Sequence, residues 1–121
     1  MSNRNLTIYH NPGCSKSRAT LALLMERGIV PRIVRYLETP PDASELTALA
    51  AKLGIRPEQL VRKGEDAYQA KYAGRMLTDA EWIEAMVTDP ILIERPIVVA
   101  GDRAIIGRPP ENVLALIDGS R

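Results

Sequence analysis

The chain has 121 residues, of which 45% are hydrophobic and 26% are charged, proportions typical of one globular domain. Sixteen Lys and Arg against 15 Asp and Glu give a formal net charge of +1, which argues against a general nucleic-acid-binding protein. No apolar run approaches the roughly 18 residues of a membrane span, and the polar start does not resemble a signal peptide. Cys14 is the single cysteine, so no internal disulfide can form and we expect a cytoplasmic protein.

The amino-terminal part of the chain is predicted to form a β-α-β unit. Residues 6–9 are an apolar run typical of a short strand, and residues 10–13 contain Asn-Pro and Pro-Gly pairs, which signal a turn. Apolar residues then repeat at the spacing of a helix that ends near Gly28: Leu21, Leu24 and Met25. Residues 33–37 indicate a second strand, which such a connection usually places parallel to the first.

The middle of the chain, about residues 41–93, is predicted to be mostly helical, with no evident strand. Asp42 with Glu45, and Thr78 with Glu81, have the spacing of capping pairs that open helices. The apolar faces of these two helices would be formed by Leu46, Leu49, Ala50 and Leu53 and by Trp82, Ile83, Met86 and Val87. Two shorter helices complete this block: 57–61 and 66–72.

The last part of the chain returns to β structure. Residues 97–100 and 103–106 flank Gly101-Asp102, a two-residue loop suited to a hairpin. Pro109 and Pro110 then open a helix, since proline suits the first helical turn. Its apolar residues would be Val113, Leu114 and Ile117.

The complete order of elements is β-α-β, a helical insert and β-β-α. This is the order of an α/β thioredoxin-like fold that carries an inserted helical subdomain. We therefore predict a single domain over residues 1–121. Its thioredoxin-like core would comprise about residues 5–40 and 94–121, and its helical insert about residues 41–93.

Cys14 stands where a thiol is expected to be reactive. Only the thiolate is a useful nucleophile, so a pKa near 8.5 must fall for reaction at neutral pH. Cys14 follows a strand and a Pro-Gly turn and begins a helix, whose N–H groups and dipole favour an anion. A buried, inert cysteine is the alternative, but the position at a helix start favours a nucleophile. The same N–H groups would bind a tetrahedral oxyanion at the sulfur.

The neighbours of Cys14 limit its chemistry. Ser17 stands where a Cys-x-x-Cys motif has its second cysteine, so an external thiol must restore an oxidised Cys14. His10, the single histidine, could stabilise the thiolate, donate a hydrogen bond to Ser17 or fill a polar position. An oxyanion beside the thiolate also needs positive charge, best supplied by arginine, but spacing alone does not select among the arginines. One Cys and one His cannot furnish a typical zinc site, so we expect no metal.

Several segments, in order along nearly the whole chain, carry a family resemblance: residues 9–18 (Tyr-His-Asn-Pro-Gly-Cys-Ser-Lys-Ser-Arg), 36–41, 60–63, 90–99 and 107–109. Together they resemble the glutaredoxin-dependent arsenate reductases, the ArsC family. Matches of this length are far more specific than a cysteine motif alone. Ser15-Lys16 stands where the arsenic-resistance enzymes carry small Gly-Thr-like residues, which is similar to a chromosomal branch of the family.

The resemblance implies an oxidoreductase that converts arsenate to arsenite through a covalent Cys14–arsenate intermediate. Cys14 would be the catalytic nucleophile, His10 would help to lower its pKa and Ser17 would assist by hydrogen bonding. The Arg95–Pro96 peptide bond would be cis. The oxyanion would bind to the three residues that match the family's arginine motifs: Arg62, Arg95 and Arg108.

The resemblance further implies a role in arsenical resistance without a bound cofactor. Glutathione would be the reducing co-substrate and glutaredoxin the protein partner of a monomer that binds neither nucleic acid nor membrane. Two alternatives remain open: a glutathione-linked reductase of another substrate, and an Spx-like redox regulator that binds RNA polymerase. The regulators share the architecture but typically carry Cys-x-x-Cys, so Ser17 favours the enzyme.

Overall fold

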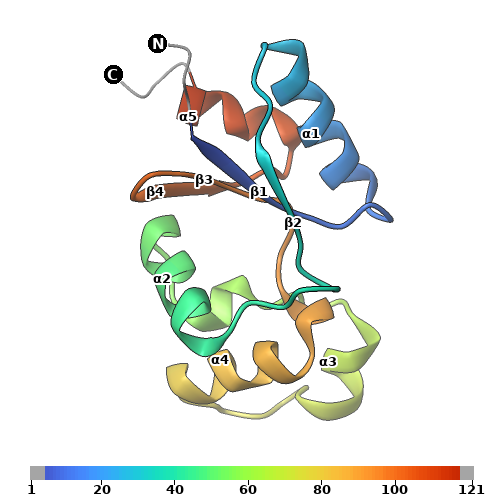
Figure 1. Cartoon of the computed structure of the whole chain (residues 1–121). Helices are drawn as coiled ribbons and strands as arrows, with labels where there is room; N and C mark the ends of the chain where they lie inside the picture. The colour runs from blue at the N-terminus through green and yellow to red at the C-terminus, as the bar shows by residue number, and fades with distance from the viewer. Residues whose placement is uncertain (1–4, 118–121) are drawn as a thin grey trace. The chain divides into compact units, whose positions relative to one another are not determined.

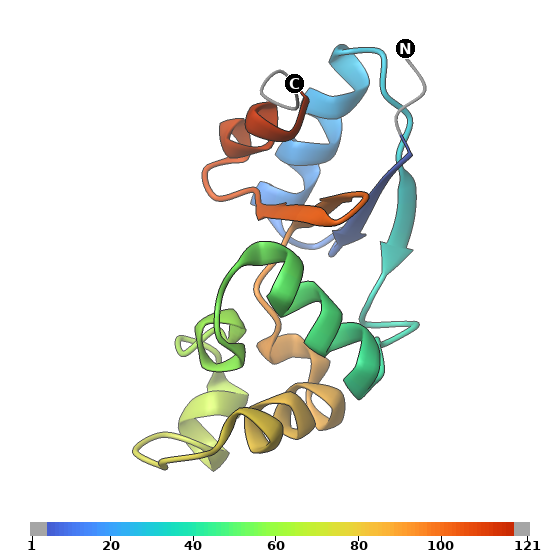
Figure 2. The same cartoon turned by 90° about the vertical axis from the view of Figure 1, so that its left-hand side faces the viewer.

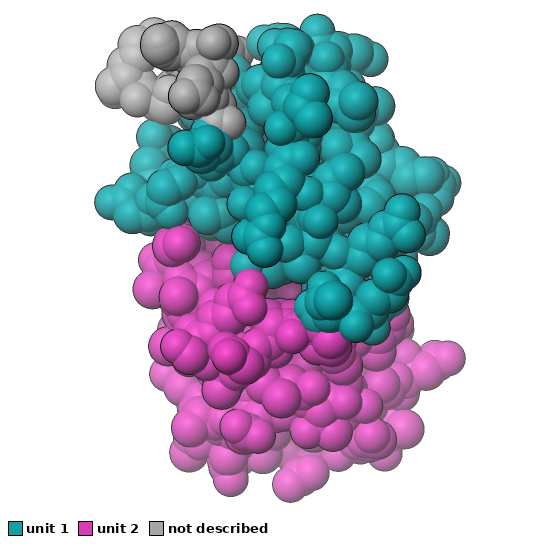
Figure 3. Space-filling view, viewed as in Figure 1, with its two compact units in different colours: residues 1–39, 95–121 teal, residues 40–94 magenta. Residues whose placement is uncertain are grey.

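The computed structural model describes residues 5–117 and divides into two compact units. One unit, Met1–Thr39 with Arg95–Arg121, contains the sheet, and the other, Pro40–Glu94, is helical (Figure 3). The sheet unit is therefore built from both ends of the chain. The helical unit is one continuous segment between them (Figure 1).

A four-stranded mixed sheet forms the centre of the sheet unit, in the order β2-β1-β3-β4. Its strands are β1 (Leu6–His10), β2 (Arg32–Arg35), β3 (Ile97–Ala100) and β4 (Arg103–Ile106). β1 runs parallel to β2 and antiparallel to β3, which pairs with β4 in a hairpin. The predicted parallel pair and the hairpin around Gly101 are confirmed, but β2 ends at Arg35, before the predicted residue 37.

Two helical segments cover one face of this sheet (Figure 2). They are α1 (Ser15–Glu26) and α5 (Leu114–Ile117), which continues the 3-10 helix η3 (Pro110–Val113). Leu6 and Ile8, which are two positions apart in β1, point towards these helices. The buried core between the helices and the sheet consists of Leu6, Ile8, Leu24, Ile29, Val98, Val113, Leu116 and Ile117.

The buried face of α1 is more polar than the sequence indicates. Of the apolar repeat, Leu24 is buried but Met25 is 54% exposed, whereas Ser17 and Thr20 are fully buried. Ser17, Thr20 and Leu24 have the spacing of one helix face, and Thr20 Oγ1 donates to the carbonyl of Gly107 at 3.4 Å. Apolar periodicity does not detect this face, because the helix turns towards the sheet hydroxyl groups that have hydrogen-bond partners.

The helical unit packs around Trp82, whose ring stacks on Tyr68 with 6.2 Å between the centroids. Thr78 and Glu81 form the predicted capping box, and Asp42 Oδ1 accepts from the Glu45 N–H at 2.8 Å. The elements of this unit are α2 (Ala43–Leu53), η1 (Pro57–Leu60), α3 (Asp66–Lys71), α4 (Asp79–Thr88) and η2 (Pro90–Leu92).

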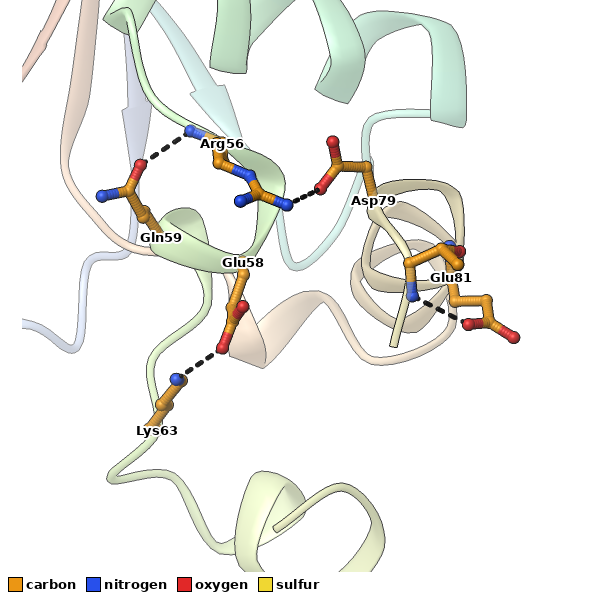
Figure 4. A network of polar contacts seen from close by, with 7 residues as sticks. Arg56, Glu58, Gln59, Lys63, Asp79 and Glu81 are labelled. Atoms are coloured by element: carbon orange, nitrogen blue, oxygen red, sulfur yellow. Dashed lines mark hydrogen bonds and ion pairs between the residues drawn. The ribbon is translucent and has the colours of Figure 1, made fainter. Parts of the chain in front are cut away.

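Polar contacts join η1 to the start of α4 on the surface of the helical unit (Figure 4). Arg56 Nη2 lies 3.3 Å from Asp79 Oδ1, and the Arg56 backbone N–H donates to Gln59 Oε1 at 2.8 Å. Lys63 Nζ donates to Glu58 Oε2 at 2.9 Å. Because the charged groups are exposed, these ion pairs add little stability.

Candidate functional site

The turn before α1 places Cys14 at the N-cap of the helix, in an extended backbone conformation. The Cys14 N–H donates to the carbonyl of Asn11 at 2.9 Å, and the Asn11 side-chain oxygen accepts from the Gly13 N–H at 2.9 Å. Asn11 thus closes the turn with both its backbone and its side chain, as Asn often does. The thiol is therefore held at the helix end whose first N–H groups have no partner within the helix.

The surroundings of the Cys14 sulfur favour the thiolate. Burial alone would raise the pKa of the thiol, but hydrogen bonds outweigh it and lower the pKa from 9.0 to about 7. The largest of these comes from the backbone N–H of Ser17, followed by the side chain of Arg95. The backbone N–H of Lys16 and the hydroxyl of Ser17 add to them. About half of the thiol is therefore ionised near pH 7.

Arg95 and Arg108 bring two guanidinium groups to the same sulfur. Arg95 is only 8% exposed, and Arg108 Nη2 lies 3.4 Å from Cys14 Sγ. Arg108 Nε also donates to the carbonyl of Arg95 at 2.7 Å, so the backbone of one arginine orients the side chain of the other. The Arg95–Pro96 peptide bond is cis, as predicted, and so is Arg108–Pro109.

His10 ends β1 and is 6% exposed, with Nδ1 fully buried. Burial lowers its pKa from 6.5, and the charges of Arg35 and Arg18 lower it further. The ring is therefore neutral at pH 7. His10 is not among the groups that shift the pKa of Cys14, and its help in lowering that pKa stays a prediction.

Arg62 belongs to the helical unit and lies between two carboxylates. Its Nε is 3.3 Å from Glu65 Oε2, and its Nη1 is 3.8 Å from Glu94 Oε1. An isolated antiparallel bridge between Val61 and Ile93, which the sequence did not predict, fixes this arrangement. It brings the Arg62 N–H to the carbonyl of Leu92 at 2.7 Å. Among the residues predicted for the site, the sheet unit brings together Cys14, Ser17, Arg95 and Arg108.

Comparison with known proteins identifies the family. A family model described as the ArsC family matches residues 9–116, which is most of the chain. The chain belongs to the ArsC family. The site at Cys14 lies within the matched range, and so do all the arginines predicted from the resemblance.

Two relatives and one solved structure match this ArsC-family protein along almost their full length. The chain is 50% identical to the uncharacterized protein YfgD of Escherichia coli K12, covering 94% of this chain and 98% of that protein. It is 46% identical to a protein named arsenate reductase from Haemophilus influenzae, over 93% and 99% of the two chains. The structure of an arsenate reductase from Vibrio cholerae matches with a TM-score of 0.90 and 46% identity, over 93% and 98%. The predicted α/β thioredoxin-like fold is confirmed.

Two features of the ArsC-family site were not predicted from the sequence. Asn11, which shapes the turn, carries a recognisable signal because Asn before Pro-Gly favours a closed turn. The contribution of the Lys16 backbone N–H follows from the helix start and needs no particular side chain. Within residues 5–117, no cluster of three or more His, Cys, Asp or Glu side chains could hold a metal ion. No helix in that range is long and apolar enough to cross a membrane.

Proposed function

We propose that this protein reduces arsenate to arsenite, with Cys14 as the nucleophile and glutathione and glutaredoxin as external thiols. The observation that carries the proposal is the Cys14 thiol with a pKa of about 7 at the N-cap of α1, in contact with Arg108 and Arg95. A nucleophilic thiolate and fixed guanidinium groups are what attack on an oxyanion requires. The names of the relatives add arsenate as the substrate.

In the first step, the Cys14 thiolate attacks arsenic(V) and a water molecule leaves, which gives a thiol–arsenate ester without change of oxidation state. The donors that stabilise the thiolate are released from the sulfur as its charge enters the new S–As bond. The guanidinium groups of Arg95 and Arg108 then donate hydrogen bonds to the arsenate oxygens. Such fixed positive charge stabilises the developing transition state without reorganisation.

Reduction then requires thiols from outside the chain, since Ser17 replaces a second cysteine. Glutathione condenses with the adduct and forms a second S–As bond. A glutaredoxin thiolate attacks the glutathione sulfur, forming a mixed disulfide and leaving the electron pair of that bond on arsenic, which becomes arsenic(III). Hydrolysis releases arsenite and the Cys14 thiol. The two electrons thus come from the glutathione–glutaredoxin pair.

Arg62 is the third oxyanion ligand, on its match to the family's arginine motif. His10 acts as an uncharged ring at pH 7, which its lowered pKa supports. We further propose one arsenate reductase-like domain that works as a cytoplasmic monomer without a bound cofactor.

Arsenate-dependent oxidation of NADPH tests the proposal in a mixture of this protein, glutathione, glutaredoxin and glutathione reductase. We expect turnover that disappears in Cys14→Ser and in the absence of glutaredoxin. Ser15→Ala, a change in an exposed neighbour, is the matched control and should retain activity. An inactive wild-type protein with a reduced Cys14 would contradict arsenate reduction and favour another glutathione-linked substrate.

A further inference from the structure

The start of α1 carries positive charge that no carboxylate neutralises. Its first five residues include Lys16 and Arg18, both exposed, and no acidic residue. Among the residues that the structure describes, neither side chain has an ion-pair partner. Positive charge is unfavourable at the N-terminus of a helix, where the helix dipole is itself positive. The stability of the helix therefore does not account for these two side chains.

Both charges stand close to the Cys14 thiol without binding it. Arg18 Nη1 donates to the carbonyl of Pro12 at 2.8 Å, in the turn that leads to Cys14. Lys16 is two residues from Cys14, and its backbone N–H is one of the donors to the sulfur. Neither the Lys16 ammonium nor the Arg18 guanidinium is among the groups that shift the pKa of Cys14. The two cationic side chains are therefore free to meet a second molecule at the sulfur.

The reaction proposed above brings an anion to this place. In its second step, Arg95 and Arg108 are engaged by the arsenate oxygens, and the Cys14 adduct is itself negatively charged. Glutathione carries two carboxylates and attacks as a thiolate, so the adduct and glutathione repel each other. The positive charge that draws glutathione in has to come from other residues near the sulfur.

We propose that Lys16 and Arg18 bind the carboxylates of glutathione and so place its sulfur at Cys14. The inference rests on the proposed function, from which it takes glutathione as the thiol. The two carboxylates of glutathione stand on either side of its cysteine, so two separated positive groups suit them. Residues two apart on a helix do not face each other, which separates these two charges. Hydrogen bonds between such cations and carboxylates are charge-assisted.

The test measures the recognition of glutathione without arsenate. The Cys14 thiolate attacks oxidised glutathione, the S–S bond of the reagent breaks, and a mixed disulfide forms while a glutathione thiolate leaves. Mass spectrometry follows the mixed disulfide at about pH 7.5, where a thiol with a pKa of about 7 is mostly ionised. The reference reagent is the disulfide of glutathione diethyl ester, which has no carboxylates. The ratio of the two rates cancels any change in the reactivity of Cys14 itself.

The wild type should react faster with oxidised glutathione than with the ester at low ionic strength, where screening is weakest. In Lys16→Gln and in Arg18→Gln, we expect the ratio of the two rates to fall by about twofold to fivefold, the range of an exposed ion pair. Lys16→Arg keeps the charge and should keep the wild-type ratio, which separates charge from a structural effect of the substitution.

Arg103→Gln is the matched control within the same unit. Arg103 is exposed and is paired with Ala100, which in turn is paired with Leu6 at the start of β1. Cys14 follows the other end of β1, so Arg103 lies far from the sulfur along the sheet. Its replacement should leave the ratio unchanged.

Four results would overturn the inference: no preference for oxidised glutathione in the wild type, an unchanged ratio in Lys16→Gln or in Arg18→Gln, an equal fall in Arg103→Gln, or a fall in Lys16→Arg as large as in Lys16→Gln. Arsenate turnover of the wild type is measured separately. An inactive wild type whose ratio falls in both Gln variants would contradict arsenate reduction and still support glutathione binding.

Discussion

Replacing Ser17 by alanine is expected to raise the pKa of the Cys14 thiol. Burial raises this pKa and several hydrogen bonds lower it, of which the Ser17 hydroxyl makes the smallest contribution. A hydrogen bond to a charged group contributes about 1.5 to 3 kcal/mol, and a change of one in pKa corresponds to about 1.4 kcal/mol. These values correspond to about one to two pH units for a typical hydrogen bond of this kind. Because the Ser17 hydroxyl makes the smallest contribution and the backbone N–H of Ser17 remains, we expect the midpoint of ionisation to rise by less, about half a pH unit to one unit.

The pH midpoint of Cys14 ionisation reports this change in pKa better than the reaction rate of Cys14 at a single pH does. A thiol with a pKa of about 7 is about 15-fold more ionised at pH 7 than one near 8.5. The thiolate of a thiol with a pKa of about 7 is itself about fivefold less nucleophilic than that of a thiol with a pKa near 8.5. The reason is that the Brønsted coefficient for attack on disulfides is about 0.45. The net gain in rate is only about threefold. A variant could therefore react almost as fast as the wild type although its pKa differs.

The assay follows the second-order rate of Cys14 with the uncharged chromogenic disulfide dithiodipyridine as a function of pH. The thiolate is the reactive form, so the wild-type rate should fall as the pH falls through about 7. Ser15→Ala is the control, since it removes an exposed hydroxyl from the same helix start. An unchanged midpoint in Ser17→Ala, or an equal rise in Ser15→Ala, would refute the role of the Ser17 hydroxyl.

Three further predictions concern single positions. His10→Gln should leave the midpoint of Cys14 ionisation within about 0.3 pH units of the wild-type value, since a neutral ring contributes no charge. A rise of about one pH unit would contradict this. Arg95→Lys should lower kcat/KM for arsenate at least about tenfold, because lysine keeps the charge but lacks the paired N–H donors of the guanidinium. Unchanged steady-state kinetics would contradict this expectation. Gly107→Ala places a Cβ 2.6 Å from Thr20 Oγ1 and should lower the free energy of unfolding in urea by about 1 to 3 kcal/mol; equal stability would argue against a crowded site.

The elements that could be predicted from the sequence are those with local signals. Thr78 with Glu81 and the loop at Gly101 each specify their own conformation within a few residues, and both predictions are confirmed. Cys14 belongs to the same class, because the Pro-Gly turn and the helix start are adjacent in the chain. Its position at the N-cap of α1 therefore follows from the residues on either side.

Features that depend on packing between distant segments were missed. Thr20 lies in the core because the carbonyl of Gly107 accepts its hydroxyl, a partner that no periodicity analysis of the helix can anticipate. Met25 is exposed for the complementary reason: the polar residues occupy the buried face. The neutral state of His10 likewise depends on burial and on Arg35, which lies opposite it on the neighbouring strand.

The environment of Arg62 shows the same distinction between local and distant signals. Glu65 is three residues away in the sequence, a spacing that often forms ion pairs. Glu94 comes close to the guanidinium through the bridge between Val61 and Ile93, which no local pattern of the sequence indicates. The motif can therefore mark Arg62 in the sequence, but the charges around its side chain are a property of the tertiary structure.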